Sequence, residues 1–289
     1  YGKDLATSVV ATAGAIGIII PPSIPMIILG ITGGISIGGL FLGGVFPGIL
    51  MGLALMVTSA LFARARRLPA ERRATWKERW GAFVDAILAL MTMVIIMGGI
   101  LSGIFTATEA SVVAAVYSFI VGKFVYGELQ WTDIPKLLVK TGITTGVVVL
   151  CIATASSFGW ILAAEQIPSK IAQFVFSLSE NRLVILFLMN GLMLFMGTFL
   201  DVSPIIIILV PILFPIASQF GVTPIHFGVM TIVNMAIGQC TPPVGISLFV
   251  ATGIAKASLG EILGAYSKYL VTMIVVLAII TVFPQIITL

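Results

Sequence analysis

Long apolar stretches separated by short polar segments dominate this chain. Windows of roughly 20 residues, enough to cross a bilayer, lie near residues 5–30, 41–63, 83–104, 108–126, 143–164, 226–250 and 266–288. Hydrocarbon offers no water to backbone N–H and C=O groups, so such segments satisfy those groups internally as helices. The pattern predicts an all-α polytopic membrane protein, with the lipid bilayer as its surroundings.

Composition agrees with this prediction. The chain is 59% hydrophobic and 9% charged, whereas a soluble domain carries roughly 25% charged residues. Seven of its fifteen Lys and Arg residues lie between Arg64 and Arg79. A basic run flanked by apolar spans is typical of a cytoplasmic loop, so we expect no nucleic-acid partner. The two cysteines, Cys151 and Cys240, both lie in apolar spans, which argues against a disulfide framework or a metal site.

Eight residues of the first span return in a later one. Residues 15–22 read AIGIIIPP and residues 236–243 read AIGQCTPP, with five of eight positions identical at a separation of 221. Each proline lacks an N–H and clashes with the carbonyl four residues earlier. The carbonyls of Gly17, Ile18, Gly238 and Gln239 therefore lose their helical partners. Paired broken helices of this kind indicate the midplane site of a secondary transporter.

The two breaks offer complementary chemistry. At each, one half-helix ends in carbonyl oxygens, and we expect the next to begin at a proline with free N–H groups. Carbonyl oxygens suit a small cation, and N–H groups suit a carboxylate. Hydroxyls lie near both breaks, at Thr12 and Ser23 and at Thr241 and Ser247. Oxygen donors without a His or Cys set favour a hard cation such as Na⁺.

Residues 183–219 form a different kind of apolar segment, with Asp201 near its centre. Two full spans would need roughly 40 residues and a turn, and would put residues 198–204 in a cytoplasmic loop without Lys or Arg. We predict a re-entrant hairpin that enters and leaves on the outer face, with two full spans as the alternative. A carboxylate inside the bilayer is costly and by default functional. The alternative role for Asp201 is a helix cap ahead of Ser203 and Pro204.

Three further features have local interpretations. Residues 129–142, with Trp131, predict an interfacial arm along the cytoplasmic surface. Thr106 and Glu109 predict a capping box at the start of the next helix. His226, at the start of the second broken span, is interpreted as an interfacial polar residue in preference to a ligand.

Four segments make the chain recognisable. AGAIGIIIPPSIPMIILG (13–30), GIFTATEA (103–110), MGTFLDVSP (196–204) and TPIHFGVMTIVNMAIGQCTPPVGISLFVA (223–251) closely resemble the large membrane (M) subunit, DctM-like, of tripartite ATP-independent periplasmic (TRAP) transporters, in the ion-transporter superfamily. The resemblance covers essentially the whole chain. One departure is Ala107, where the family often has proline.

The resemblance implies an inverted-repeat, elevator-type transporter with broken helices and a re-entrant hairpin. On this interpretation, residues 1–63 end the first repeat, 64–82 form a basic cytoplasmic connector and 83–289 form the second repeat. The second repeat then holds the arm 129–142, the hairpin 183–219 and the broken helix 226–250. Because the first repeat is shorter than the second, we expect it to be truncated at the N-terminus, with the family's first hairpin upstream of Tyr1.

The resemblance also implies a function. It predicts a multi-pass protein of the bacterial inner membrane that takes up an organic acid on a Na⁺ gradient, the acid being a C4-dicarboxylate, a sialic acid or a similar carboxylate. The implied partners are a small four-helix membrane (Q) subunit and a periplasmic substrate-binding (P) protein. Carried over by position, one cation site uses Thr198, Asp201, Gly238, Thr241, Pro242 and Gly245. The other uses Gly14, Gly17, Ile20 and Pro21 with residues outside the chain. Candidates to contact the substrate are Ser23, Thr241 and Ser247.

Other classes of function stay open as alternatives. The sequence has no Walker A loop, HExxH pair or Gly-x-Ser-x-Gly elbow, so we expect no enzyme activity. A related elevator symporter that works without a binding protein is the first alternative, and a non-transporting scaffold or channel is the second. No Arg lies inside a predicted span, so the sequence leaves the identity of the acid open.

Overall fold

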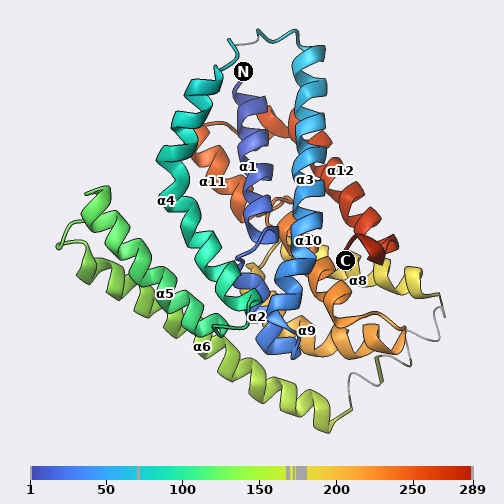
Figure 1. The fold of residues 1–289 in the computed structure, drawn as a ribbon. Coiled ribbons are helices and arrows are strands. Elements are labelled where there is room, and N and C mark those ends of the chain that lie inside the picture. The colour runs from blue at the N-terminus through green and yellow to red at the C-terminus, as the bar shows by residue number, and fades with distance from the viewer. Residues whose placement is uncertain (1, 70–71, 167–169, 172, 174–180, 288–289) are drawn as a thin grey trace. The chain divides into compact units, whose positions relative to one another are not determined.

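The computed structural model describes residues 2–69, 72–166, 170–171, 173 and 181–287. Regular structure in these residues is helical, and none of them forms a strand (Figure 1). The chain divides into two compact units, Tyr1–Leu68 with Cys151–Leu289, and Pro69–Leu150. Each unit is described by itself.

The first unit contains both sequence repeats of the helix break. Its helices are α1 (Lys3–Ile19), α2 (Ile24–Gly33), α3 (Ile37–Ala65), α8 (Arg182–Gly197), α9 (Val202–Gln219), α10 (Pro224–Gly238), α11 (Ile246–Ala255), α12 (Leu259–Val282) and the 3-10 turn η2 (Pro284–Ile286). Helix α10 is the centre of this unit, because every residue from His226 to Gly238 is buried. It packs against α1, α2, α3, α8, α9 and α12.

The start of α1 is tied to the end of α3. The Asp4 carboxylate accepts two hydrogen bonds from the Arg66 guanidinium, at 3.1 and 2.6 Å. This side-chain hydrogen bond raises the pKa of Arg66, which lies just beyond the last residue of α3. Four residues before Arg66, Phe62 of α3 stacks on Tyr269 of α12 with ring centroids 5.7 Å apart. These contacts join α1, α3 and α12 at one end of the unit.

The second unit contains α4 (Trp76–Leu101), α5 (Ala107–Ile120), the π-turn η1 (Val121–Val125) and the first part of α6 (Ile134–Ala164). Thr106 and Glu109 form the predicted capping box: each accepts a hydrogen bond from the other's backbone N–H. The Tyr117 hydroxyl donates to the carbonyl of Leu88 at 2.9 Å and joins α5 to α4.

Helix lengths confirm a polytopic membrane protein. In the described part of the chain, six helices, α9 among them, are long and apolar enough to cross a bilayer, and the bent pair α1–α2 is a seventh if its two helices form one span. The position of residues 129–142 along the cytoplasmic surface stays a prediction, but the structure does not separate them from the helix that follows. Residues 134–142 are the first turns of α6 and continue into its apolar part without a break, because that segment contains no residue after Pro135 that stops a helix.

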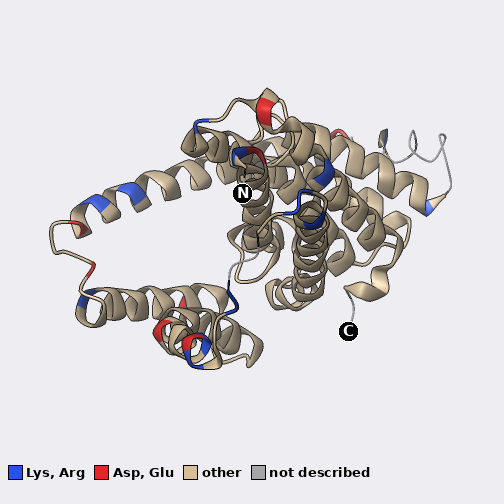
Figure 2. Cartoon of the chain, turned by 90° about the horizontal axis from the view of Figure 1, so that it is seen from above, with Lys and Arg blue, Asp and Glu red and all other residues tan. Residues whose placement is uncertain are grey.

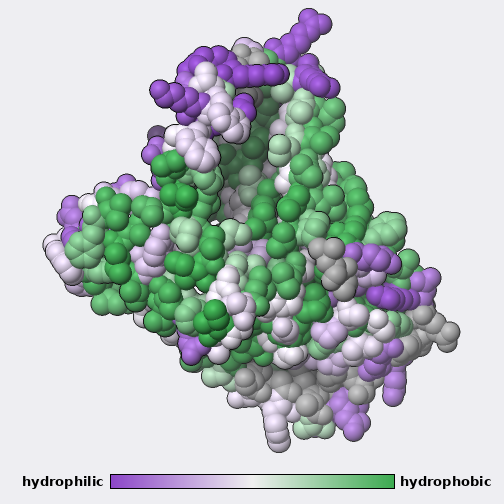
Figure 3. All heavy atoms as spheres, in the orientation of Figure 1, coloured by the Kyte–Doolittle hydropathy of each residue, from purple (hydrophilic) through white to green (hydrophobic). Residues whose placement is uncertain are grey.

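The surface has the character expected of a membrane protein. Most of each helix carries no charged residue, and Lys and Arg are prominent near helix ends and connections (Figure 2). Hydrophobic residues cover much of the helices in view, while hydrophilic residues gather around the segment that follows α3 (Figure 3). That segment is the basic run of residues 64–79.

Candidate functional site

The first helix break lies between α1 and α2. Helix α1 ends at Ile19, because the next residues include Pro21 and Pro22, which have no N–H to donate. The Pro21–Pro22 peptide bond is cis, and the helix axis bends by 44° between α1 and α2. Ser23 is buried and is the N-cap of α2, where its hydroxyl accepts a hydrogen bond from the N–H of Met26 at 3.5 Å. The structure thus gives Ser23 a capping role.

The second helix break, between α10 and α11, has the same Pro-Pro step, and the Pro242–Pro243 bond is also cis. It is longer, because residues 239–245 separate the two helices, compared with residues 20–23 at the first break. Gly245 ends this turn with φ of 49°. A Cβ on Gly245 would lie 2.9 Å from the carbonyl oxygen of Thr241. Both the left-handed backbone and the close approach require glycine here.

Two details of the breaks correct the sequence analysis. The second half-helices begin at Ile24 and Ile246 instead of at a proline, because Ser23 and the pair Val244–Gly245 separate the Pro-Pro steps from them. The carbonyls of Gly238 and Gln239 lack helical partners but accept from the N–H groups of Thr241 and Ser247, at 2.9 and 3.0 Å. Each carbonyl oxygen has a second lone pair that these bonds leave available.

Helices α8 and α9 form a helical hairpin at the predicted position. The tip consists of the four residues 198–201, and the Thr198 hydroxyl donates to the carbonyl of Phe195 at 2.7 Å. The tip lies directly against the second break: a Cβ on Gly238 would be 2.8 Å from the Cα of Gly197 and 3.1 Å from its carbonyl carbon. The two backbones meet this closely because both residues are glycine.

Asp201 connects the hairpin to the break through its side chain. It is the N-cap residue of α9, yet its carboxylate accepts no hydrogen bond from the N–H groups of that helix. Oδ1 accepts instead from Nε2 of Gln239 at 2.8 Å. The alternative interpretation of Asp201 as a side-chain cap therefore does not describe this structure, since the carboxylate is directed to the break.

Gln239 is a residue that sequence reasoning missed. The repeat itself contained the signal, because Gln239 aligns with Ile18 in AIGIIIPP and AIGQCTPP. A polar residue that replaces an apolar one inside an otherwise matched motif is a candidate for a role beyond forming the break.

Other contacts fix the second break within the unit. The Thr241 hydroxyl donates to the carbonyl of Ile237 at 2.8 Å. Cys240 is buried, its thiol donates to the carbonyl of Ala11 in α1 at 3.4 Å, and its carbonyl accepts a hydrogen bond from the Tyr266 hydroxyl of α12. The break is therefore held by α1 on one side and by α12 on the other.

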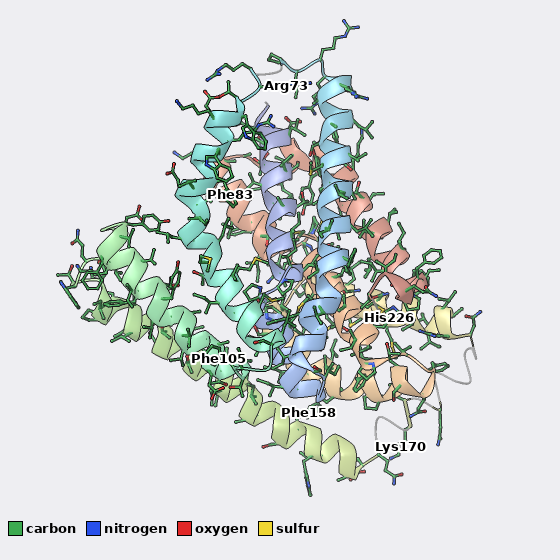
Figure 4. All side chains as sticks on the ribbon, in the orientation of Figure 1. Arg73, Phe83, Phe105, Phe158, Lys170 and His226 are labelled. Atoms are coloured by element: carbon green, nitrogen blue, oxygen red, sulfur yellow. The ribbon has the colours of Figure 1, made fainter. Side chains whose placement is uncertain are left out.

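Buried polar side chains join the hairpin arm α8 to α10. Nδ2 of Asn234 donates to the backbone carbonyl and to Oδ1 of Asn190, at 2.8 and 3.0 Å. His226 is fully buried in α10 (Figure 4). Its Nε2 lies 3.0 Å from the carbonyl oxygen of Ile280, and its Nδ1 lies 3.5 Å from Arg182. His226 is thus a packed residue with backbone and side-chain partners, and its position at the membrane interface stays a prediction.

The structure brings together the residues assigned to one predicted cation site. Gly197, which precedes Thr198, meets Gly238, and Asp201 accepts a hydrogen bond from Gln239. The turn after Gly238 carries Thr241, Pro242 and Gly245. The residues assigned to the other site lie along the first break. There Gly14 and Gly17 are exposed, and a Cβ on either would meet no other described residue within 4 Å. Ile20 is half-buried and Pro21 is buried.

A polytopic helical protein with two matched helix breaks, one of them in contact with a hairpin tip, has the architecture of a secondary transporter. Residues 1–286 match the family described as tripartite ATP-independent periplasmic transporter, DctM component. The chain belongs to this family.

Characterised relatives resemble the chain over nearly its whole length. It is 42% identical over 286 residues to the C4-dicarboxylate TRAP transporter large permease protein DctM of Pseudomonas aeruginosa, covering 99% of this chain and 67% of that protein. It is 40% identical over 285 residues to the sialic acid TRAP transporter large permease protein SiaM of Vibrio cholerae, with the same coverage. It is 39% identical over 288 residues to the sialic acid TRAP transporter permease protein SiaT of Haemophilus influenzae, covering 100% of this chain and 47% of that protein.

Proposed function

We propose that this chain is the transporting subunit of a Na⁺-coupled uptake system for an organic acid, in a bacterial inner membrane. A small membrane subunit and a periplasmic binding protein complete the system. Support comes from membership of the DctM family and from relatives whose names state C4-dicarboxylate and sialic acid TRAP transport. The acid carried by this chain belongs to the same class of small carboxylates.

The contact between the hairpin tip and the second break carries this proposal. Gln239 lies about halfway along the broken span of residues 224–255. If that span crosses the bilayer, its break lies near the midplane, and so does the tip that touches it. A tip at that depth favours a re-entrant hairpin over two full spans, which would place residues 198–201 at a membrane surface.

The groups at this contact suit a hard cation. Oxygen is the only type of donor that they offer: the Asp201 carboxylate, the hydroxyls of Thr198 and Thr241, and backbone carbonyls of the turn. Each hydroxyl donates its proton to a carbonyl, so its lone pairs are left to face a positive charge. Among the described residues, no three His, Cys, Asp or Glu side chains form a group that could hold a metal ion. The donor set therefore fits Na⁺, whose gradient supplies the driving force for uptake.

Helix ends supply the complementary chemistry for the substrate. The carboxyl ends of α8 and α10 meet at the break, and the amino ends of α9 and α11 begin there. Carbonyl ends favour the cation and N–H ends favour a carboxylate. Ser247, in the first turn of α11, is half-buried and is the candidate among these residues to contact the substrate. Buried side chains join the hairpin arm α8 to α10, so we expect these elements to move as one body. Their joint inward movement would be an elevator step.

Topology can be tested with a cysteine at the tip. In a background with Cys151→Ala and Cys240→Ala, we expect Leu200→Cys to resist a membrane-impermeant maleimide added from the cytoplasmic side. Arg73→Cys, in the basic connector, is the matched control and should react rapidly from that side. Rapid cytoplasmic labelling of Leu200→Cys would support two full spans and contradict the hairpin.

Uptake by the reconstituted system tests the function. Proteoliposomes that hold this protein with its small subunit should accumulate the acid only with an inward Na⁺ gradient and with the loaded binding protein outside. Replacement of Na⁺ by K⁺ should abolish accumulation. Uptake that is Na⁺-dependent without the binding protein would favour the binding-protein-independent symporter. Absence of saturable uptake under any gradient would favour a scaffold or channel.

A further inference from the structure

Gln239 is not required to form the helix break. The first copy of the motif has Ile18 at the aligned position, and α1 still ends beside its Pro-Pro step with the same cis bond. The missing N–H groups of the prolines end the helix in both copies. The side chain of Gln239 therefore has a role that the Pro-Pro step does not explain.

The position of the Gln239 amide relates it to the hairpin. Its Nε2 donates to Oδ1 of Asp201 at 2.8 Å, across 38 residues of sequence. Among the described residues, no other side-chain to side-chain hydrogen bond joins the tip at 198–201 to the break at 239–245. Asp201 accepts no capping bond from α9, although a carboxylate that caps a helix in this way typically stabilises it. The carboxylate is thus directed to Gln239 instead of to its own helix.

The charge of Asp201 is only partly compensated by this contact. Neither of the two ion pairs among the described residues, Asp4–Arg66 and Arg72–Glu78, includes Asp201. A neutral amide offers a partial positive charge to a carboxylate, whereas a bound cation offers a full one. A cation bound to this carboxylate weakens the attraction of Oδ1 for the amide, because the amide hydrogens carry partial positive charge, and the amide is the weaker partner.

We propose that Gln239 is a positioning residue that holds the Asp201 carboxylate when no cation is bound and is displaced from it when Na⁺ binds. The inference rests on the proposed function, because it assigns Asp201 to the cation. Gln239 then keeps the tip against the break in the cation-free protein. It also lowers the apparent affinity for Na⁺, because part of the binding free energy is used to break the hydrogen bond.

The substitution Gln239→Met tests this proposal, since it keeps the length of the side chain and removes the amide. Na⁺ is the probe. The melting temperature of the purified protein and the equilibrium binding of radioactive Na⁺ are each measured at increasing Na⁺ concentrations. We expect the apparent affinity for Na⁺ to rise roughly threefold to tenfold, as for the loss of one competing charge-assisted hydrogen bond. The melting temperature should fall in Na⁺-free buffer and equal that of the wild type at saturating Na⁺. A merely structural role would lower both melting temperatures.

Two further variants make the test specific. Gln239→Ile introduces the residue of the first break, which the fold accepts there, and should reproduce the effect of Gln239→Met. Gln219→Met makes the same change at the exposed far end of α9 and should leave the affinity for Na⁺ unchanged.

The outcomes separate this inference from the function on which it rests. An unchanged affinity in Gln239→Met, with a wild type that responds to Na⁺, would overturn the role of Gln239 and leave the proposed function standing. A lower affinity would also overturn it, because Gln239 would then be a ligand of the cation. A wild type with no response to Na⁺ would contradict the proposed function itself.

Discussion

The two helix breaks share five of eight residues, yet their surroundings differ. At the second break, the backbone of Gly238 touches that of Gly197, and Gln239 binds Asp201 of the hairpin tip. At the first break, the aligned Gly17 is exposed, and a side chain there would meet no other described residue within 4 Å. Among the described residues, the motif therefore packs against a hairpin tip at the second break and has no such neighbour at the first.

The backbone of the two breaks differs as well. The carbonyls of Gly238 and Gln239 accept hydrogen bonds from Thr241 and Ser247 within the turn. No backbone donor of the described turn residues reaches the aligned carbonyls of Gly17 and Ile18. The longer second turn closes because Gly245 adopts a left-handed conformation, and the aligned residue at the first break is Ile24, which begins α2. A Pro-Pro step thus fixes where a helix ends, while the residues after it decide how the chain turns.

The variant with the largest expected effect tests the negative charge of Asp201, which lies beside the second break. Asp201→Asn keeps the size of the side chain and its ability to accept from Gln239, and removes the negative charge that only the second break has beside it. We expect Na⁺-driven uptake to fall by more than about a hundredfold, the equivalent of about 2.8 kcal/mol, while the purified protein stays folded and monodisperse. Asp4→Asn, a charge deletion in the Asp4–Arg66 pair, is the control and should transport normally. Normal uptake by Asp201→Asn would remove this residue from the site.

A matched pair of glycine substitutions tests the difference in packing. Gly238→Ala places a Cβ 2.8 Å from the Cα of Gly197, so two backbones must separate, and we expect a loss of about 3 kcal/mol in the free energy of unfolding. Gly17→Ala has open space around it and should gain up to about 1 kcal/mol from helix propensity. Thermal melting of the two variants of this 289-residue chain measures both. Equal destabilisation of the two would contradict the difference in surroundings.

The smallest expected effect concerns one hydroxyl. Thr241 aligns with Ile20, so Thr241→Val makes the second break resemble the first at this position while keeping the volume of the side chain. The hydroxyl donates to Ile237 inside the turn, and its loss removes one oxygen from the proposed cation site. We expect the affinity for Na⁺ to fall by about 1–2 kcal/mol with little change in melting temperature. An unchanged Na⁺ dependence of uptake would exclude Thr241 as a ligand.

Much of this protein is predictable from local sequence. Length and apolar composition predicted the spans, and Pro21, Pro22, Pro242 and Pro243 predicted where two of them break, because a missing N–H acts within one helical turn. Thr106 and Glu109 predicted a capping box for the same reason, since both partners lie within four residues. The hairpin arms followed from an apolar segment too short for two full spans.

Contacts between distant segments were decided by the tertiary structure alone. The packing of α8, α9, α10 and α12 decides three contacts. These join Gly197 to Gly238, the Asp201 carboxylate to Gln239, and His226 to the carbonyl of Ile280. Hydropathy and proline positions describe each segment by itself and contain no information on which segments touch. The sequence by itself thus determined the helices and the places where they break. Packing over tens of residues decided that this hairpin tip contacts the second break, because the close approach of two backbones requires Gly197 and Gly238 to lie at the same place in the fold.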